Sequence, residues 1–388
     1  MKNAITKLDN YHILGARSVK HSLSIMGDRF CNTPVVDSNV MCAVDEITNV
    51  QRIDLHGCTV MPALFDTHTH GAVGVDYTTS SGEQIEDMLP YYTAHGITSI
   101  LATIMTQDVD IMCRQLDTCA QLMGNNRTVK GIHLEGPFLS AQYKGAMEEQ
   151  YLQPISINLF DRLFNASKGY IKQITIAPEL VNAPQLTRYA TDLGITVSLG
   201  HTGATVEQAQ LCVDEGAKCV THMYNAMDKC FDKGKLLDYY INNDELYCEL
   251  ICDGQHIPPP TLNRIAHSKC QFKTILVSDS IMASGVPYGT YSIAGQTVTV
   301  SEKGVFLANG KRAGSNSNNF ANLLMYCQYT DTLLQDAIKC ATINPAQMLG
   351  YEQLGSLSEG YYADFIVIDN QYNLLATYQN GVCVYKSI

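Results

Sequence analysis

The stretch QITIAPELVNAPQLTRYATDLGITVSLGH, residues 173–201, contains one complete strand–helix–strand unit. Two β-rich runs, 173–179 and 196–201, flank an amphipathic stretch that ends in Gly194, a common stop signal for a helix. Strands joined by a crossover helix of this length pair in parallel, because the helix returns the chain to the edge where the first strand began. The stretch therefore predicts a parallel sheet covered by helices.

The same unit recurs along the chain from about residue 60. Eight β-rich runs alternate with amphipathic stretches, and eight such units predict an α/β protein with a (β/α)8 TIM-type barrel. The runs occupy residues 59–66, 98–104, 130–136, 173–179, 196–201, 219–225, 247–254 and 274–280. Helices are expected at residues 81–96, 109–124, 158–169, 183–194, 205–216 and 258–269, with two closing helices at 317–328 and 333–350.

The two ends of the chain follow a different pattern. Residues 1–59 and 355–388 contain short alternating runs separated by turn residues, which favours antiparallel strands. We expect a small β-sandwich domain formed by residues 1–59 plus 355–388, beside a catalytic barrel over residues 60–354. Residues 291–312, after the eighth run, predict an inserted β-hairpin.

Composition excludes several classes of protein. Of the 388 residues, 46% are hydrophobic and 16% are charged, a balance typical of globular chains. The net charge of −12, without any basic run, argues against a nucleic-acid partner. No apolar run is long enough to span a membrane and no apolar leader opens the chain, so we expect a cytoplasmic protein. The 14 cysteines form no CxxC pair and are expected to be reduced.

Histidines and acids gather where the predicted strands end. A barrel of this type carries its active site at the carboxyl ends of the strands. A lone histidine at a strand end is more often structural, but this many at one rim favours a shared site. His68 and His70 are two residues apart, so both side chains fall on the same face of a strand. The residues at these ends are Asp66, His68, His70, Glu135, His201, His222, Asp253, His256 and Asp279.

This combination of side chains indicates metal chemistry. Neutral imidazoles together with carboxylates suit a divalent transition metal such as Zn or Fe. A bound metal lowers the pKa of its water to about 7. A nearby carboxylate, here Asp279, can take the proton from that water and pass it to a leaving group. The residues therefore predict metal-assisted hydrolysis.

Seven short motifs at or beyond these strand ends also carry a family resemblance. HLEGPF and the TH–YNAM pair are specific, whereas the HxH pattern is widespread. Together the motifs closely resemble the N-acetylglucosamine-6-phosphate deacetylase family of the amidohydrolase superfamily, from about residue 55 to the end. The motifs are FDTHTHG (65–71), HLEGPFLS (133–140), GHTGAT (200–205), THMYNAM (221–227), DGQHIPP (253–259), VSDS (277–280) and ATINPAQMLG (341–350).

The resemblance implies an activity and a role for each matching residue. The expected reaction is metal-dependent hydrolysis of the acetamide of N-acetylglucosamine 6-phosphate to glucosamine 6-phosphate and acetate, by a homodimer with one or two ions. Glu135, His201 and His222 match the metal ligands, and Asp279 matches the catalytic acid/base. His68 and His70 match the first metal pair of the superfamily and leave a second ion position open. The residues expected to bind substrate are Asn225, Ala226, His256, Lys233, Ala146, Arg312, Ala313 and Gly314.

Three departures from the family pattern concern the substrate. Met147 stands where the family usually has a histidine, and methionine cannot donate a hydrogen bond. Lys233 or Lys235 replaces an arginine that reaches the phosphate across a dimer interface, and Arg312 stands where leucine is common. These changes leave two other substrates open, N-acetylgalactosamine 6-phosphate and an unphosphorylated N-acetyl amino sugar.

Two other classes of function remain as alternatives. A catalytically silent barrel would serve as a binding or scaffold protein, but such relatives usually lose metal ligands that this chain keeps. A cyclic-amide hydrolase would commonly use a lysine carboxylate bridge between two metals, and Glu135 occupies one of the strand ends where that lysine is found.

Overall fold

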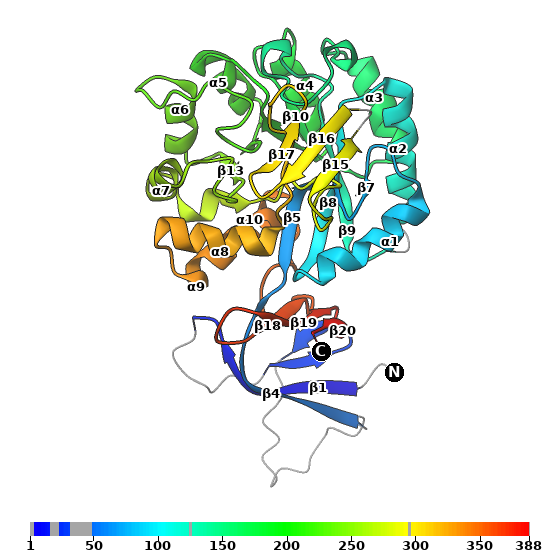
Figure 1. Ribbon diagram of the computed structural model, residues 1–388, viewed down its shortest axis with the longest axis vertical. Helices are drawn as coiled ribbons and strands as arrows, with labels where there is room; N and C mark the ends of the chain where they lie inside the picture. Colours follow the sequence, from blue (N-terminus) through cyan, green and yellow to red (C-terminus); the bar gives the residue numbers. More distant parts are fainter. Residues whose placement is uncertain (1–3, 16–22, 32–48, 124–125, 294–295, 388) are drawn as a thin grey trace.

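The computed structural model of the chain describes residues 4–15, 23–31, 49–123, 126–293 and 296–387. Figure 1 shows a larger body, in which helices surround strands, above a smaller sheet near both chain termini. Among the described residues, no helix is both long and apolar enough to cross a membrane. Several predicted segments fall partly outside these ranges, at residues 1–3, 16–22, 32–48, 124 and 294–295.

The larger body contains the predicted parallel sheet of eight strands, which confirms the (β/α)8 fold class. Each strand pairs in parallel with its neighbour in the sequence order of the runs. The strands are β5 (Leu64–Thr69), β8 (Ile97–Met105), β9 (Val129–Glu135), β10 (Ile171–Ile176), β11 (Thr196–Leu199), β12 (Cys219–Val220), β13 (Tyr247–Leu250) and β14 (Thr274–Leu276). Near the carboxyl ends of the two outermost strands, β5 and β14, backbone hydrogen bonds run from Asp279 to His68 (2.8 Å) and from His70 to Ser280 (2.7 Å).

Most helices lie where the amphipathic stretches predict them, but the single closing helix predicted at residues 333–350 was wrong. A 3-10 turn at Ile338–Ala341 and the non-helical backbone of Thr342 divide it into two short helices, α9 (Leu334–Ala337) and α10 (Ile343–Met348). The longer helices bury an apolar stripe, and Thr205 caps α5 (Val206–Asp214) by accepting a hydrogen bond from the backbone of Gln208. A seven-residue helix, α6 (Leu236–Asn242), was not predicted because two turns show too little periodicity. The others are α1 (Gly82–Thr93), α2 (Val109–Leu122), α3 (Ile157–Ala166), α4 (Ala183–Asp192), α7 (Pro259–Ser268) and α8 (Asn319–Thr330).

Both chain ends contribute strands to one seven-stranded sheet. Its order is β20-β19-β18-β4-β1-β2-β3, in which only β1 and β4 pair in parallel. A separate apolar cluster supports it, with the rings of Phe365 and Tyr378 stacked 4.4 Å apart. The strands are β1 (Ala4–Ile13), β2 (Ser24–Met26), β3 (Arg29–Cys31), β4 (Asn49–Pro62), β18 (Phe365–Ile368), β19 (Leu374–Gln379) and β20 (Val382–Lys386). The proposed domain boundaries at residues 59 and 355 remain a prediction.

The insertion after β14 has one strand more than predicted. It is an antiparallel sheet of β15 (Gly289–Ile293), β16 (Gln296–Ser301) and β17 (Gly304–Leu307), drawn in yellow in Figure 1. The prediction of a hairpin over residues 291–312 was therefore incomplete, because β15 begins before Tyr291. Apolar residues of β16 and β17 form one cluster with Met105, the last residue of β8, and with Met147, which follows β9. The insertion thus lies beside the rim where the predicted site residues stand.

Candidate active site

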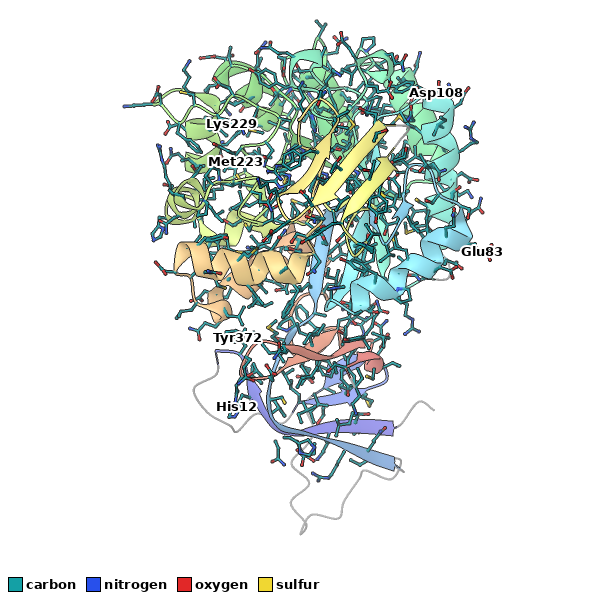
Figure 2. All side chains as sticks on the ribbon, viewed as in Figure 1. His12, Glu83, Asp108, Met223, Lys229 and Tyr372 are labelled. Atoms are coloured by element: carbon teal, nitrogen blue, oxygen red, sulfur yellow. The ribbon has the colours of Figure 1, made fainter. Side chains whose placement is uncertain are left out.

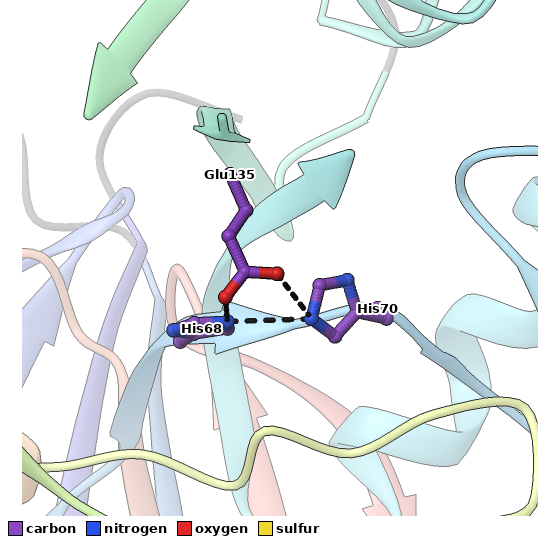
Figure 3. Close-up of side chains that lie close together, drawn as sticks. All are labelled: His68, His70 and Glu135. Atoms are coloured by element: carbon purple, nitrogen blue, oxygen red, sulfur yellow. Dashed lines mark hydrogen bonds and ion pairs between the residues drawn. The ribbon is translucent and has the colours of Figure 1, made fainter. Parts of the chain in front are cut away.

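The five predicted metal ligands converge at the carboxyl ends of the barrel strands. His68 and Glu135 lie at the ends of β5 and β9, and Figure 3 shows both side chains turned towards His70. His201 and His222 each stand two residues beyond the end of a strand, after β11 and β12. All five are buried, so their polar atoms need partners other than bulk water.

One group of donors consists of His68, His70 and Glu135. The Nε2 atoms of the two histidines lie 3.3 Å apart. Each faces the carboxylate of Glu135, with His68 3.4 Å from Oε1 and His70 3.4 Å from Oε2. All three donor atoms lie close enough to one another to bind a single cation.

A second group consists of Glu135, His201 and His222. The Nε2 atoms of both histidines lie 3.1 Å from Oε1 of Glu135 and 3.1 Å from each other. His201 donates from Nδ1 to the backbone carbonyl of Tyr143 at 2.9 Å, which leaves Nε2 as its free lone pair. Glu135 is therefore common to both groups, and the donor set fits one or two divalent transition ions.

The surrounding histidines determine the charge of the two central acids. Burial opposes ionisation of Glu135, yet His68, His201 and His222 keep its pKa well below its usual range. Burial also opposes ionisation of Asp279, but a hydrogen bond with His70 and the charges of nearby histidines lower its pKa to about 2. Oδ1 of Asp279 lies 3.2 Å from Nε2 of His70. Both carboxylates are thus ionised at neutral pH.

Three of these residues have a backbone conformation that is rare for side chains with a Cβ. His201, His222 and Asp279 have φ angles of 49°, 29° and 46°. Such left-handed residues are uncommon outside glycine and gather at functional sites, where the surrounding fold enforces them. At Gly145 (φ 61°) a Cβ would lie only 3.1 Å from the His201 ring, so glycine lets this loop pack against a predicted ligand.

A cavity of about 480 Å³ opens beside the ligands. Most residues predicted for catalysis or substrate binding line it, and Met147, the departure from the family pattern, lines it too. Lys233 is exposed and does not line the cavity of its own chain. The predicted residues that line the cavity are His70, Glu135, Ala146, His201, His222, Asn225, Ala226, His256, Asp279, Arg312, Ala313 and Gly314.

His256 has a fixed orientation at this cavity. Its Nδ1 lies 2.7 Å from Oδ2 of Asp253, and its backbone N–H donates to Oδ1 of the same carboxylate. Burial raises the pKa of Asp253, but these hydrogen bonds and the His256 charge outweigh burial and lower it. The pair leaves Nε2 of His256 as the ring atom available to a molecule in the cavity.

Four polar residues are among those at or near the site that were not predicted. Lys229 (labelled in Figure 2), Lys311 and Gln255 line the cavity. Glu249 lies on β13, fully buried, and contacts His68. The sequence held one signal for it, because an acid inside the apolar run YCELIC must face buried partners. The two lysines gave no signal, since charged loop residues are usually solvated.

Comparisons with known proteins identify similar chains. A model of the amidohydrolase family matches residues 59–386. The chain is 33% identical over 340 residues to an N-acetylglucosamine-6-phosphate deacetylase from Lysinibacillus sphaericus, covering 86% of this chain and 87% of the relative. It is 29% identical over 364 residues to an N-acetylgalactosamine-6-phosphate deacetylase from Escherichia coli O157:H7, covering 92% of this chain and 95% of that relative.

A solved structure shares the fold over the whole chain. The crystal structure of N-acetylglucosamine-6-phosphate deacetylase from Pasteurella multocida superposes with a TM-score of 0.89 at 27% identity. The match covers 99% of this chain and 100% of that one. Barrel, terminal sheet and insertion therefore occur together in a protein of this kind.

Proposed function

The chain belongs to the amidohydrolase family, and from that premise we propose that it is a deacetylase of N-acetylglucosamine 6-phosphate. It hydrolyses the acetamide and releases glucosamine 6-phosphate and acetate. The observation that carries the proposal is the meeting of five metal donors and an ionised Asp279 at one cavity. Two relatives that bear this activity in their names cover 86% and 98% of the chain.

We assign the metal to the donor groups that share Glu135. The principal position consists of Glu135, His201 and His222, and a further position consists of His68, His70 and Glu135. A divalent ion bound there would polarise the acetamide carbonyl and acidify a water molecule. Zinc or iron is the proposed metal, because imidazole and carboxylate ligands suit both.

Asp279 is the proposed catalytic acid/base. Its carboxylate is ionised at neutral pH and lines the cavity, so it can accept a proton from the attacking water. The same carboxylate then delivers that proton to the nitrogen of the departing amine, which leaves as the free amino sugar. His70, 3.2 Å from Oδ1 of Asp279, keeps the carboxylate directed at the donor groups.

The remaining lining residues are proposed to bind the sugar phosphate. Asn225 and Ala226 follow β12, while Arg312, Ala313 and Gly314 approach from the insertion, with Ala146 and His256 also lining the cavity. Lys229, Lys311 and Arg312 bring positive charge to a chain of net charge −12, which supports a phosphorylated substrate. Lys233 would contact the phosphate in the cavity of a second copy of the chain, so a homodimer is part of this proposal. A cytoplasmic location is also proposed.

A second substrate has one specific observation in its favour. A relative with 29% identity is named for N-acetylgalactosamine 6-phosphate, which differs in sugar stereochemistry. The deciding experiment measures acetate release from N-acetylglucosamine 6-phosphate, N-acetylgalactosamine 6-phosphate and unphosphorylated N-acetylglucosamine. We expect the highest kcat/KM for the first. Equal use of the phosphorylated and unphosphorylated glucosamine compounds would refute phosphate recognition, and no release from any of the three would refute the deacetylase.

A further inference from the structure

The side chain of Glu249 connects four strands inside the barrel. Glu249 lies on β13 and is fully buried. Oε1 accepts hydrogen bonds from Nε2 of Gln173 at 2.7 Å and Oγ1 of Thr67 at 3.4 Å. Oε2 lies 3.1 Å from Nδ1 of His68 and accepts the backbone N–H of His222 at 3.3 Å. Because these partners come from β5, β10 and the end of β12, the carboxylate points into the barrel interior.

The charge of Glu249 has one partner among the described residues. A fully buried carboxylate is unfavourable unless it is paired and hydrogen-bonded. In the ion pairs of the described residues, Glu249 contacts only the imidazole of His68, and neither lysine nor arginine takes part. His68 is therefore the one ionisable group paired with Glu249 among the described residues.

This contact fixes which nitrogen of His68 can bind a metal. Both oxygens of Glu249 already accept from other donors, so the carboxylate is the acceptor in this contact and Nδ1 of His68 carries the proton. The lone pair of Nε2 then faces Oε1 of Glu135 at 3.4 Å and Nε2 of His70 at 3.3 Å. A carboxylate that accepts from the far nitrogen of a metal-binding histidine orients the ring and makes it a better ligand.

The same oxygen also reaches the other donor group. Oε2 of Glu249 accepts the backbone N–H of His222, whose side chain belongs to the second group. This atom therefore orients the ring of His68, whereas at His222 it contacts only the backbone N–H and not the ring that would bind the metal. Gln173 holds the other oxygen of the carboxylate, because its Nε2 donates to Oε1 of Glu249. The Oε1 atom of Gln173 itself has no hydrogen-bond partner among the described residues.

We propose that Glu249 is a positioning residue for the ion position formed by His68, His70 and Glu135. It acts through His68, because Glu249 does not line the cavity. The inference rests on the metal-dependent activity proposed above and deepens it, since it identifies what makes a second ion possible. Without Glu249, the ion at Glu135, His201 and His222 remains and the other is lost.

Ion counting on the full chain tests this proposal. We would load wild type, Glu249→Ala and Glu249→Gln with zinc, remove free metal, and measure zinc per chain and the affinity of each ion. Wild type should bind two ions and Glu249→Ala one, with affinity at the lost position reduced by roughly 10–100-fold. Anomalous diffraction should then show one peak, beside Glu135, His201 and His222.

The glutamine variant separates charge from shape. Gln173 can rotate its amide so that its unpartnered oxygen accepts from Gln at position 249, which keeps an acceptor facing His68. Glu249→Gln should therefore bind the second ion with intermediate affinity. Asp364→Asn is the matched control, because Asp364 is another buried carboxylate but accepts from the backbone of Asn380 in the terminal sheet. It should keep both ions.

Two results would overturn the proposal. One is a Glu249→Ala protein that binds two ions with wild-type affinity, and the other is a wild-type chain that binds only one. If the alanine variant does not fold, a Glu249→Gln protein that binds both ions with wild-type affinity would overturn the proposal instead. Ion counting involves no sugar, so failure of the deacetylase assignment and failure of this inference would be seen separately.

Discussion

Arg312 donates a hydrogen bond of 3.0 Å to the side-chain oxygen of Gln255, a residue 57 positions earlier in the chain. Its Nη1 also donates to the backbone carbonyl of Lys303 at 3.3 Å, and the guanidinium lies over the ring of Phe306. These partners are neutral, and no ion pair of the described residues includes Arg312. The contacts fix the guanidinium at the cavity and leave its positive charge for an anion there.

Replacing Arg312 with alanine should weaken the phosphorylated substrate selectively. A charge-assisted hydrogen bond is worth roughly 1.5–3 kcal/mol, which corresponds to a KM raised about tenfold to a hundredfold. Steady-state kinetics should show this increase for N-acetylglucosamine 6-phosphate and none for the unphosphorylated sugar. Arg188→Ala, which removes an exposed arginine on α4, is the control. An unchanged KM for the phosphorylated substrate in Arg312→Ala would show that Arg312 does not bind the phosphate.

Removing the metal should abolish turnover reversibly. Chelation followed by gel filtration should yield an inactive protein that regains activity when zinc or iron is returned, because the carbonyl and water lose their activation. Glu135→Ala, His201→Ala and His222→Ala should each lower metal content, measured by elemental analysis. Full metal content in these three variants would contradict the ligand assignment.

Changing Asp279 to asparagine should separate catalysis from metal binding. We expect kcat to fall by roughly 10²–10⁴-fold, since asparagine cannot carry a proton between water and amine. Metal content should stay at the wild-type value. The pKa of Asp279 is about 2, so its carboxylate stays ionised well above that pH. A change of kcat/KM with pH above about pH 5 would therefore come from the titration of a different group. A near-normal kcat in Asp279→Asn would show that another group is the catalytic acid/base.

The pair of Asp253 and His256 should contribute stability that depends on pH. The pKa of Asp253 is lowered in the folded chain, so its contribution is complete above the unfolded value of about 3.9 and is lost as pH falls through the folded value. Asp253→Asn should therefore lower the free energy of unfolding by about 1–3 kcal/mol at neutral pH.

Urea unfolding of metal-free wild type and variant at pH 7 and at about pH 3.5 measures this effect. The difference between the two proteins should shrink at the lower pH. A difference of the same size at both values would mean that the carboxylate charge does not stabilise the fold.

The sequence predicted the barrel because its strands are buried on both faces. Continuous apolar runs such as TSILATI stand out between amphipathic helices, and the ligands stand where those runs end. The family was recognised from seven motifs, most of which lie at the carboxyl ends of the barrel strands, and the family comparison confirms the family.

Other features depend on contacts that no local pattern reveals. Glu249 meets His68 across the barrel, 181 residues away, and this pairing follows from the register of separate strands. Gln255 and Arg312 meet only because the insertion folds back beside the rim. The first strand of that insertion, β15 (GTYSI), was not predicted as a separate strand, because it begins two residues before the predicted hairpin at 291–312.

The pairing of β4 with β18 has a consequence for how the chain is made. Pro62 of β4 lies opposite Phe365 of β18, so one side of β4 stays open while the ribosome synthesises the whole barrel. Pairing between such distant segments is slow, and an unpaired strand edge is a template for association with other chains. A nascent chain therefore exposes this edge of β4 to association with other chains until translation is nearly complete. A chain that terminates before residue 365 lacks β18 and cannot cover the edge.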